Sequence, residues 1–434
     1  MIIIDNILNK RGKDNNPIRI GIIGTGQMGT GIIHHINKYT KGIQISGVYN
    51  RTLEKAIKAF NIAGIEKYQK LDNPDQLNKS DKSIPFITNN IDVLVQAENI
   101  DLILEVTGTV NFAANTILQA FKNGKNILSF NVEIDATLGP LLKTISRENN
   151  VHYCVSDGDQ PGVTMNLYRF VKGMGFNPLL CGNIKGLQDH YRNPSTQKSF
   201  AKKWGLSPEM ATSFADGTKI SFEQACIANA TGMKVAKRGM FGYYSDKHID
   251  DLTGLYEIDF LKETGGIVDY IVGAKPGPGV FIYAENGNEF NQHFLKYAKM
   301  GSGPLYSFYT PYHLLFFEIS ASICRLMDLN DYTVSPVAGP VVEVVANAKT
   351  DIKPGTVLDG LGGYLTYGVC ENAHIARNEN LLPIGLAEGL VVKKNMEKDQ
   401  TLTFEDVEFK MDDNLITLYR KQCQLFKLKE PSSL

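Results

Sequence analysis

A glycine-rich turn directly after an apolar stretch constrains this chain more than any other feature. Residues 18–23 read Ile-Arg-Ile-Gly-Ile-Ile, and glycines follow at Gly24, Gly26 and Gly29. This spacing predicts strand, turn and helix: Gly24 allows the turn, Gly26 lets backbone approach a pyrophosphate, and Gly29 lets helix pack on strand. The pyrophosphate would bind at the helix N-terminus. A glycine turn without a ligand is the alternative, and a second apolar strand at 43–49 argues against it.

The end of the second predicted strand indicates which nicotinamide cofactor the site takes. NAD sites place a carboxylate there, roughly 20 residues past the glycines, whereas here Asn50 and Arg51 follow the strand and the first carboxylate is Glu54. The forked guanidinium suits a 2′-phosphate, so we predict NADP rather than NAD, with a solvated arginine as the alternative. The predicted cofactor-binding residues are Gly24, Gly26, Gln27, Met28, Gly29, Asn50, Arg51, Thr107 and Gly108.

Length and composition narrow the class of protein. A chain of 434 residues exceeds one hydrophobic core, so two or three domains are expected. A formal net charge of −1 argues against nucleic acid or an anionic membrane surface as a partner. Apolar runs stay below the roughly 20 residues that a membrane span needs. The six cysteines are scattered without a Cys-x-x-Cys pair, which predicts reduced thiols in a cytoplasmic protein.

Strand-like and helix-like stretches alternate from residue 18 to about residue 150. Further strands are expected at 101–106 and 126–130, and the polar stretch 67–90 is expected to be an exposed excursion. This alternation predicts an α/β fold with a Rossmann-type, doubly wound parallel sheet, which binds ligands at the carboxyl ends of its strands.

The rest of the chain changes character twice. From about residue 151, glycine, proline and aromatic residues cluster, which predicts an α+β substrate-binding and dimerisation domain, and an apolar helix at 313–327 is expected to return to the nucleotide domain. Beyond it, short valine-rich runs alternate with turns, as in a small β-rich module. The predicted domains are 1–150 for NAD(P) binding, 151–331 for substrate and dimerisation, and 332–434 for the β-rich module.

Several motifs together resemble one family of proteins. Besides GTGQMG they are NVEID at 131–135, SDGDQPG at 156–162, FADGTKISFEQACIANATG at 214–232, TPYHL at 310–314, AKTDIKPGTVLDGLGGY at 348–364 and LLPIGLAEG at 381–389. The set resembles homoserine-dehydrogenase-like oxidoreductases with a C-terminal SAF domain, over nearly the whole chain. Such a β-clip-like domain can cover an active site, and a purely structural role is the alternative.

The best understood members of this family are the deoxyxylulose-phosphate reductoisomerase-like enzymes. The resemblance implies NADPH dependence, a divalent metal, isomerisation followed by reduction of a sugar phosphate, and a homo-oligomer. Homoserine dehydrogenases carry a catalytic lysine in an Ala-Asn-Lys motif, whereas residues 130–133 here read Phe-Asn-Val-Glu. Val132 stands in the place of that lysine, which argues against homoserine dehydrogenase itself.

Carbonyl reduction needs a group that protonates the developing alkoxide. Lys185 is the first candidate, because it follows the apolar run 178–181, precedes Gly186, and burial would lower the pKa of its ammonium. A surface lysine is the alternative. Glu133, just past a predicted buried strand, would orient Lys185, act as a base or help to hold a metal, unless it caps a helix. Asp189 is the third catalytic candidate.

Two further groups are candidates for binding. Arg192 and Asn193 would bind the substrate, with Arg192 suited to a phosphate and a solvated arginine as the alternative. Asp157 and Asp159, two residues apart, would bind Mg²⁺ or Mn²⁺, although a plain turn explains them as well.

The sequence therefore predicts an NADP-dependent oxidoreductase that acts on the CH-OH/carbonyl couple. It would reduce a small phosphorylated keto or aldehydo sugar, directly or after isomerisation. Homoserine dehydrogenase is one alternative, and a non-catalytic nucleotide- or carbohydrate-binding protein is the other.

Overall fold

The computed structural model describes residues 3–409 and 414–432, which fold into two compact units. Unit 1 holds the described residues up to 135, with 141–159 and 314–335, and unit 2 holds 136–140, 160–313 and the described residues from 336 onward. The predicted domain boundaries near 150 and 331 stay predictions. None of the described helices combines the length and apolar character that crossing a membrane requires.

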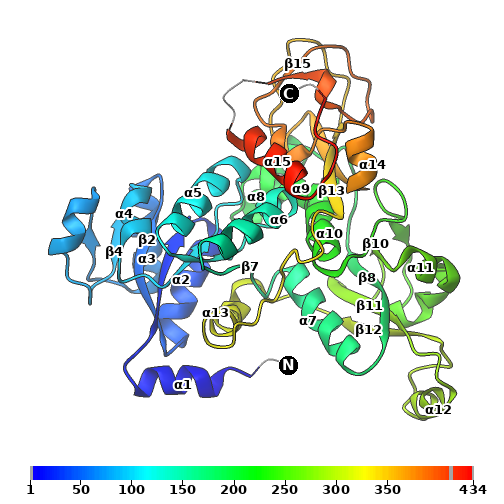
Figure 1. Cartoon of the computed structure of the whole chain (residues 1–434), viewed down its shortest axis with the longest axis horizontal. Helices are drawn as coiled ribbons and strands as arrows, with labels where there is room; N and C mark the ends of the chain where they lie inside the picture. The colour runs from blue at the N-terminus through cyan, green and yellow to red at the C-terminus, as the bar shows by residue number, and fades with distance from the viewer. Residues whose placement is uncertain (1–2, 410–413, 433–434) are drawn as a thin grey trace. The chain divides into compact units, whose positions relative to one another are not determined.

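Unit 1 is built on a seven-stranded parallel sheet with the strand order β3-β4-β2-β1-β5-β6-β7 (Figure 1). Strand β1 lies between β2 and β5, so the chain winds outward from it in both directions, as in a doubly wound sheet. The predicted Rossmann-type fold is thereby confirmed. The strands are β1 (Ile18–Ile23), β2 (Ile43–Tyr49), β3 (Gln69–Lys70), β4 (Phe86–Thr88), β5 (Leu102–Glu105), β6 (Asn126–Ser129) and β7 (Tyr153–Val155).

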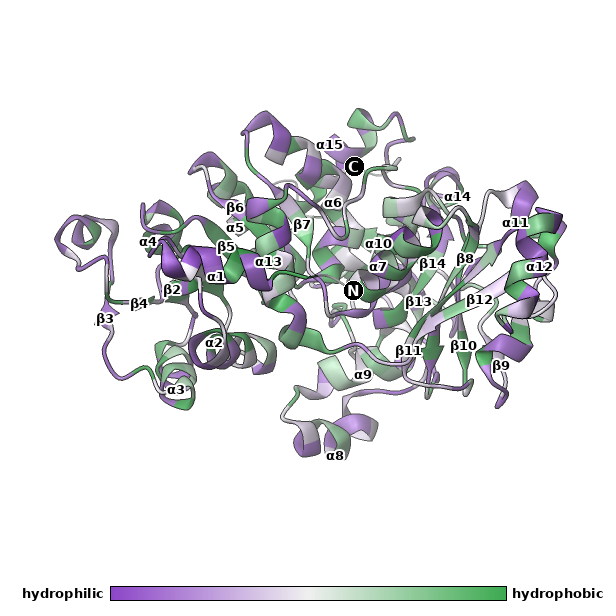
Figure 2. Ribbon diagram, turned by 90° about the horizontal axis from the view of Figure 1, so that it is seen from below, coloured by the Kyte–Doolittle hydropathy of each residue, from purple (hydrophilic) through white to green (hydrophobic). Residues whose placement is uncertain are grey.

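Helices cover this sheet because its strands are apolar on both faces. Figure 2 draws β5 and β6 largely in the hydrophobic colour, and their isoleucines and leucines are buried. The helices of the unit are α1 (Asp5–Lys13), α2 (Gln27–Tyr39), α3 (Leu53–Ala63), η1 (Pro74–Lys79), α4 (Ile91–Gln96), α5 (Val110–Lys122), α6 (Val132–Glu148), η3 (Leu315–Glu318) and α13 (Ile319–Asp328). Residues 136–140 of α6 belong to unit 2.

Two expectations about this unit had different outcomes. The return of the chain to the nucleotide unit is confirmed, because Ile319, Ile323 and Leu326 of α13 lie in the same apolar cluster as the strands β1 and β2. The expectation of an exposed excursion over 67–90 is wrong at its end: Phe86, Ile87 and Thr88 form the buried strand β4, which pairs with β2. Polar neighbours on both sides hid this three-residue strand.

Unit 2 contains a five-stranded mixed sheet with the order β12-β11-β8-β10-β9. Its strands are β8 (Asn177–Lys185), β9 (Tyr243–Tyr244), β10 (Ile267–Val272), β11 (Gly279–Glu285) and β12 (Leu305–Thr310). Its helices are α7 (Gln160–Gly173), α8 (Pro194–Trp204), α9 (Pro208–Asp216), α10 (Thr218–Thr231), η2 (Ile249–Leu255), α11 (Ile258–Thr264) and α12 (Glu289–Tyr297). Every described residue of α12 is at least partly exposed, and Figure 1 shows this helix standing away from the sheet on its own loop.

The C-terminal part of unit 2 is rich in short strands, as predicted. Its elements are β13 (Val342–Ala348), β14 (Thr366–Asn372), α14 (Ala373–Asn378), η4 (Ile384–Leu386), β15 (Val391–Val392), η5 (Phe404–Asp406), β16 (Val407–Glu408) and α15 (Asn414–Leu425). Strands β13 and β14 form an antiparallel pair. The Asn229 side chain of α10 accepts hydrogen bonds from the amides of Val341 and Val342, which ties this part to the rest of the unit.

Candidate functional site

The glycine turn of unit 1 has the geometry that a dinucleotide needs. Gly24 has a φ of +99°, in the left-handed region that favours glycine. A Cβ on Gly29 would lie 2.0 Å from the carbonyl oxygen of Gly24, so only glycine lets α2 approach β1 this closely. A Cβ on Gly26 would meet nothing within 4 Å. The turn therefore leaves open space in front of Gly26, at the start of α2, and fits a pyrophosphate.

The turn after β5 lies beside this glycine loop. A Cβ on Gly24 would lie 2.9 Å from the carbonyl oxygen of Val106, the residue that follows β5. Gly108 has a φ of +70°, and Thr109 precedes the first residue of α5. Because β1 and β5 are neighbours, the two turns form the crevice at which a doubly wound sheet binds ligands. The structure thus brings Thr107 and Gly108 to the predicted glycines.

The remaining cofactor candidates differ in what their side chains do. Asn50 braces the glycine loop: its Oδ1 accepts from the amide of Thr25 at 3.1 Å, and its Nδ2 donates to the carbonyl of Thr52 at 2.8 Å. Arg51 is exposed and forms no ion pair with any described residue. Gln27 is exposed and Met28 half-buried in the first turn of α2. Arg51 is therefore a cation available to a ligand at this edge.

Glu105, the last residue of β5, is a fully buried carboxyl at the same edge that the sequence analysis missed. Its Oε1 accepts hydrogen bonds from the amide of Thr107, at 2.9 Å, and from the Thr107 hydroxyl. Burial raises the pKa of Glu105 to about 7, the Thr107 hydrogen bonds and the nearby Asn131 side chain oppose this shift, and the Glu133 carboxylate adds to it. A charged residue ending the apolar run Leu-Ile-Leu-Glu was the available signal.

Glu133 and the acidic loop also belong to unit 1. Glu133 is buried in the first turn of α6, a helix that the Asn131 side chain caps. Asp157 is wholly buried: its Oδ1 accepts from Arg325 at 3.0 Å, and its Oδ2 accepts from Ser322 at 2.9 Å and from Thr333 at 2.8 Å.

The acidic loop therefore anchors the returning segment, and it offers a metal little. Both oxygens of Asp157 serve α13 and the residues after it, and Asp159 is 7 % exposed. Across residues 3–409 and 414–432, no group of three or more His, Cys, Asp or Glu side chains is placed to hold a metal ion.

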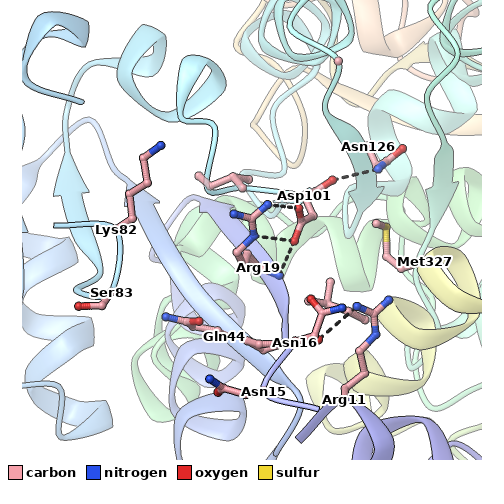
Figure 3. A pocket seen from close by; sticks show the side chains of 14 residues that line it. Arg11, Asn15, Asn16, Arg19, Gln44, Lys82, Ser83, Asp101, Asn126 and Met327 are labelled. Atoms are coloured by element: carbon pink, nitrogen blue, oxygen red, sulfur yellow. Dashed lines mark hydrogen bonds and ion pairs between the residues drawn. The ribbon is translucent and has the colours of Figure 1, made fainter. Parts of the chain in front are cut away.

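A cavity of about 1040 Å³ in unit 1 lies at the opposite edge of the sheet (Figure 3). Its walls come from the first residues of β1, β2 and β6 and from Asp101, just before β5. Arg19 pairs with Asp101 at 2.5 Å, and Arg11 pairs with Asp328 at 2.6 Å. Because doubly wound sheets bind ligands at carboxyl ends and both arginines are already paired, we assign this cavity no role in cofactor binding.

The catalytic candidates Lys185 and Asp189 belong to unit 2, whereas Glu133 belongs to unit 1. Lys185 is the half-buried last residue of β8, opposite Val272 of β10. Asp189 follows on the next loop, where its Oδ2 accepts from the Arg192 side chain at 2.9 Å. The Oδ1 of Asn193 accepts from the amides of Ser195 and Thr196 and so caps α8. Arg192 and Asn193 thus have structural partners, and their substrate roles stay predictions.

Lys349, from the C-terminal part, holds this loop in place through hydrogen bonds. Its buried ammonium donates to the carboxylate of Asp216 at 2.9 Å, to the carbonyl of Arg192 at 2.8 Å and to the carbonyl of Gly363 at 2.7 Å. Burial raises the pKa of Asp216, and the Lys349 charge opposes that shift. All three ammonium hydrogens are used, so Lys349 holds together segments that are far apart in sequence.

This loop lines a cavity of about 660 Å³, and all residues that line the cavity belong to unit 2. It is lined by residues 188–191, by residues 237–242 with Tyr244, by Tyr270 of β10, and by side chains of the C-terminal part that include Asn347, Tyr367 and Asp399. His190 stacks on Tyr367, with ring centroids 4.5 Å apart. Aromatic faces and polar groups thus meet in one cavity, a combination typical of small-molecule sites.

A chain of hydrogen bonds orders the wall that the C-terminal part supplies. Asp399 accepts from the hydroxyl of Tyr191 at 2.9 Å and from the hydroxyl of Tyr367 at 3.0 Å. The Nδ2 of Asn347 donates to the Tyr367 hydroxyl at 3.3 Å. The Oδ1 of Asn347 and the Oε1 of Gln188 are buried and have no hydrogen-bond partner among the described residues. Lys237, which also lines the cavity, forms no ion pair with any described residue. The cavity is therefore lined by a carboxylate, that of Asp399, and by a cation, that of Lys237, whereas the two unpartnered oxygens are covered by other atoms.

Two family models match successive segments of this chain. Residues 24–156 match the family model of the NAD binding domain of homoserine dehydrogenase, and residues 158–319 match the model of the catalytic domain of oxidoreductase DRL. Among curated proteins, the redox-sensing transcriptional repressor Rex of Caldicellulosiruptor bescii is 27% identical over 116 residues, which are 27% of this chain and 52% of the repressor. The match thus spans about half the length of that relative.

Solved structures with similar folds include dehydrogenases. Scyllo-inositol dehydrogenase from Lactobacillus casei, with bound NAD(H) and scyllo-inositol, is 13% identical with a TM-score of 0.40, over 74% of this chain and 92% of that one. The 1-deoxy-D-xylulose 5-phosphate reductoisomerase from Zymomonas mobilis, in complex with NADPH, is 15% identical with a TM-score of 0.34, over 49% and 57%.

Proposed function

We propose that this chain, an NAD(P)-dependent oxidoreductase by the two domains that it matches, uses NADPH to reduce the carbonyl of a small phosphorylated keto or aldehydo sugar, directly or after isomerisation. The observation that carries the proposal is the fit of the glycine turn to a pyrophosphate, in a chain whose next domain matches an oxidoreductase catalytic domain. The bound nicotinamide supplies the hydride, and the protein's own groups bind, orient and protonate.

Arg51 supports NADPH over NADH. It follows β2, where an NAD site would carry a carboxylate, and its exposed guanidinium has no described carboxylate partner. Its charge acts on the neighbouring Tyr49 hydroxyl, whose pKa burial raises and Arg51 lowers. A 2′-phosphate on the adenosine ribose would accept the charge-assisted hydrogen bonds that this side chain can donate.

The cavity of unit 2 supports a hydroxylated, anionic substrate. The exposed carboxylate of Asp399 would accept from sugar hydroxyls, and Lys237 would pair with a phosphate. We propose that the C-terminal part acts here as an SAF-type module, contributing one wall of the substrate site rather than only stabilising the fold.

Three residues are proposed for proton transfer. Lys185 would donate the proton that the developing alkoxide needs, Asp189 would hold the substrate near it, and Glu133 would act as a base. A divalent metal stays part of the proposal only as a group that the substrate itself helps to bind, since Asp157 has no oxygen to spare.

We propose further that the chain forms a homo-oligomer in the cytoplasm. The helix α12 exposes Phe290, Phe294 and Tyr297, with 71%, 54% and 85% of their surface accessible. An antiparallel pair of these helices would bury the rings and bring Glu289 of one copy to Lys296 of the other. Phe294→Asp should then shift the sedimentation coefficient to that of a monomer, whereas Phe200→Asp should not.

The described cysteines are all free thiols, which supports a reducing compartment.

The deciding experiment follows NADPH oxidation with Mg²⁺ or Mn²⁺ and a panel of phosphorylated ketoses and aldoses, beside aspartate semialdehyde. Turnover of a sugar phosphate that Lys185→Ala abolishes, with NADPH binding retained, is the expected result. Turnover of aspartate semialdehyde alone would overturn the proposed substrate in favour of homoserine dehydrogenase. Normal turnover by Lys185→Ala would overturn the assigned donor.

The match to a redox-sensing repressor gives the non-catalytic alternative one specific observation. It covers only 116 residues, however, and leaves the cavity of unit 2 without a role. NADPH binding with no oxidation across the whole panel would favour this alternative and count against the proposed reduction.

A further inference from the structure

Glu105 is a buried ionisable group at the cofactor edge that the proposed reaction does not use. Its strand β5 lies in the middle of the sheet, with Glu105 paired to Ile23 of β1 on one side and to Ser129 of β6 on the other. Its side chain is fully buried beneath the turn Thr107–Thr109. The carboxyl is therefore covered by the turn after β5 and is not part of the surface of the crevice between the two turns.

The two oxygens of this carboxyl are in unequal situations. Oε1 accepts twice from Thr107, whereas Oε2 is buried and accepts no hydrogen bond of good geometry, and the nearby Asn131 side chain only partly favours the ionised form. An ionised oxygen without donors is costly in such surroundings, and a proton on Oε2 removes the charge while leaving both Thr107 bonds in place. The carboxyl can thus take up a proton without any rearrangement of the turn.

Neighbouring charges make ionisation harder still. Of the elements packed against Glu105, β1 and β6 present the uncharged Ile23 and Ser129, the turn presents Thr107, and the start of α6 presents Asn131 and the carboxylate of Glu133. The charged group among these neighbours is Glu133, another negative charge. A dinucleotide brings several more, on its pyrophosphate and on any 2′-phosphate.

We propose that binding of the anionic dinucleotide is coupled to uptake of a proton by Glu105, so that the protein binds NADPH more tightly in its Glu105-protonated form. The inference rests on the dinucleotide site of the proposed function. No bond to the cofactor is involved: the proton comes from solvent, goes to Oε2, and removes a buried charge that would repel the ligand. Glu105 is thus a regulatory group of the cofactor site, poised near neutral pH.

The test is calorimetry of NADPH binding to the full chain at pH 7 in two buffers of different ionisation enthalpy, which counts protons taken up. We expect net uptake, and a fall in NADPH affinity of about tenfold between pH 6 and pH 8.5, the change that follows from a shift of one pKa unit on binding. Glu105→Gln keeps the acceptor for Thr107 and has no proton to gain, so its affinity should be flat over this range.

Two controls separate Glu105 from other titrating groups. NADH lacks the 2′-phosphate, whose own titration lies near pH 6, so the proton uptake should persist with NADH. Glu133→Gln removes the neighbouring charge, and the fall in affinity should then begin at a lower pH.

Each outcome decides between distinct claims. Binding of NADPH by the unmodified protein without proton uptake overturns the inference alone, as does a pH dependence that Glu105→Gln retains. Failure of both nucleotides to bind overturns the dinucleotide site, and the proposed function with it. Since calorimetry on the unmodified protein counts the protons directly, the inference stays testable even if Glu105→Gln folds poorly.

Discussion

The cofactor edge of unit 1 and the cavity of unit 2 are built from different material. At the cofactor edge the backbone makes the site. Gly24, Gly26 and Gly29 have no Cβ atom, which allows the turn and the close approach of backbone, and the following helix supplies its amides. In the cavity, side chains from several distant stretches make the site, and hydrogen bonds join Tyr191 and Tyr367 to Asp399. The first site is local in sequence, and the second exists only after folding.

This difference has an energetic side. A backbone site depends on close approach of a helix and a strand, so it tolerates most side-chain changes and fails where a Cβ is added. A site of side chains depends on a few buried polar contacts, of which the Lys349–Asp216 pair is the most enclosed near the cavity. The two regions should therefore respond differently to substitution.

The largest effect is expected at Lys349. Lys349→Met leaves the Asp216 carboxylate buried without its cation, which should lower the free energy of unfolding by about 3–5 kcal/mol. Urea denaturation of the full chain measures this, with the exposed Lys353→Met as the matched control. The double variant Lys349→Met/Asp216→Asn should recover part of the loss. Equal stability of Lys349→Met and Lys353→Met would show that the cavity wall does not depend on this pair.

Glu105 breaks the simple comparison, because it is a side chain at the backbone-built edge. Its pKa in the folded protein is about 7, above the value of 4.5 that it has when exposed, so folding favours its protonated form. It therefore costs the folded state nothing below about pH 4.5, and up to about 3 kcal/mol once the pH has risen through 7.

The corresponding experiment compares unfolding of Glu105→Gln and the unmodified protein in urea from pH 5 to pH 8. The stability advantage of the glutamine variant should grow with pH across this interval and level off above it. A constant difference would mean that Glu105 is ionised, and compensated, throughout.

The sequence predicted the cofactor edge far better than the cavity, for a physical reason. Glycine spacing and strand composition are local, so the sheet order around β1 and the turn at Gly24 follow from them. The strand Phe86–Thr88 was hidden by polar flanks, because three residues carry no periodicity. The contacts of Tyr367 with His190 and of Asp399 with Tyr191 join segments more than a hundred residues apart, which one sequence does not reveal.

The backbone side of the comparison is sharpened by two glycine variants. Gly29→Ala places a Cβ 2.0 Å from the Gly24 carbonyl, so the helix must move away, and stability should fall by about 2–3 kcal/mol with loss of NADPH binding. Gly26→Ala adds a methyl group to open space, so stability should hold and only NADPH affinity should fall. Fluorescence titration with NADPH, beside urea denaturation, separates the two. A Gly26→Ala protein that unfolds as easily as Gly29→Ala would contradict the assignment of the open space to a ligand.

The smallest expected effect concerns the one side chain at the cofactor edge that chooses between ligands. Arg51→Gln removes an exposed cation that has no described carboxylate partner, so the fold should be untouched. NADPH affinity should fall about tenfold, or about 1.4 kcal/mol, while NADH affinity stays the same, because only NADPH carries the 2′-phosphate. Lys55→Gln, an equal loss of charge on the helix that follows, controls for long-range electrostatics. If Arg51→Gln and Lys55→Gln weaken both nucleotides alike, general charge attraction and not a specific contact selects the cofactor. In that case the backbone and the general electrostatic field of the protein, rather than one side chain, would determine which ligand binds at this edge.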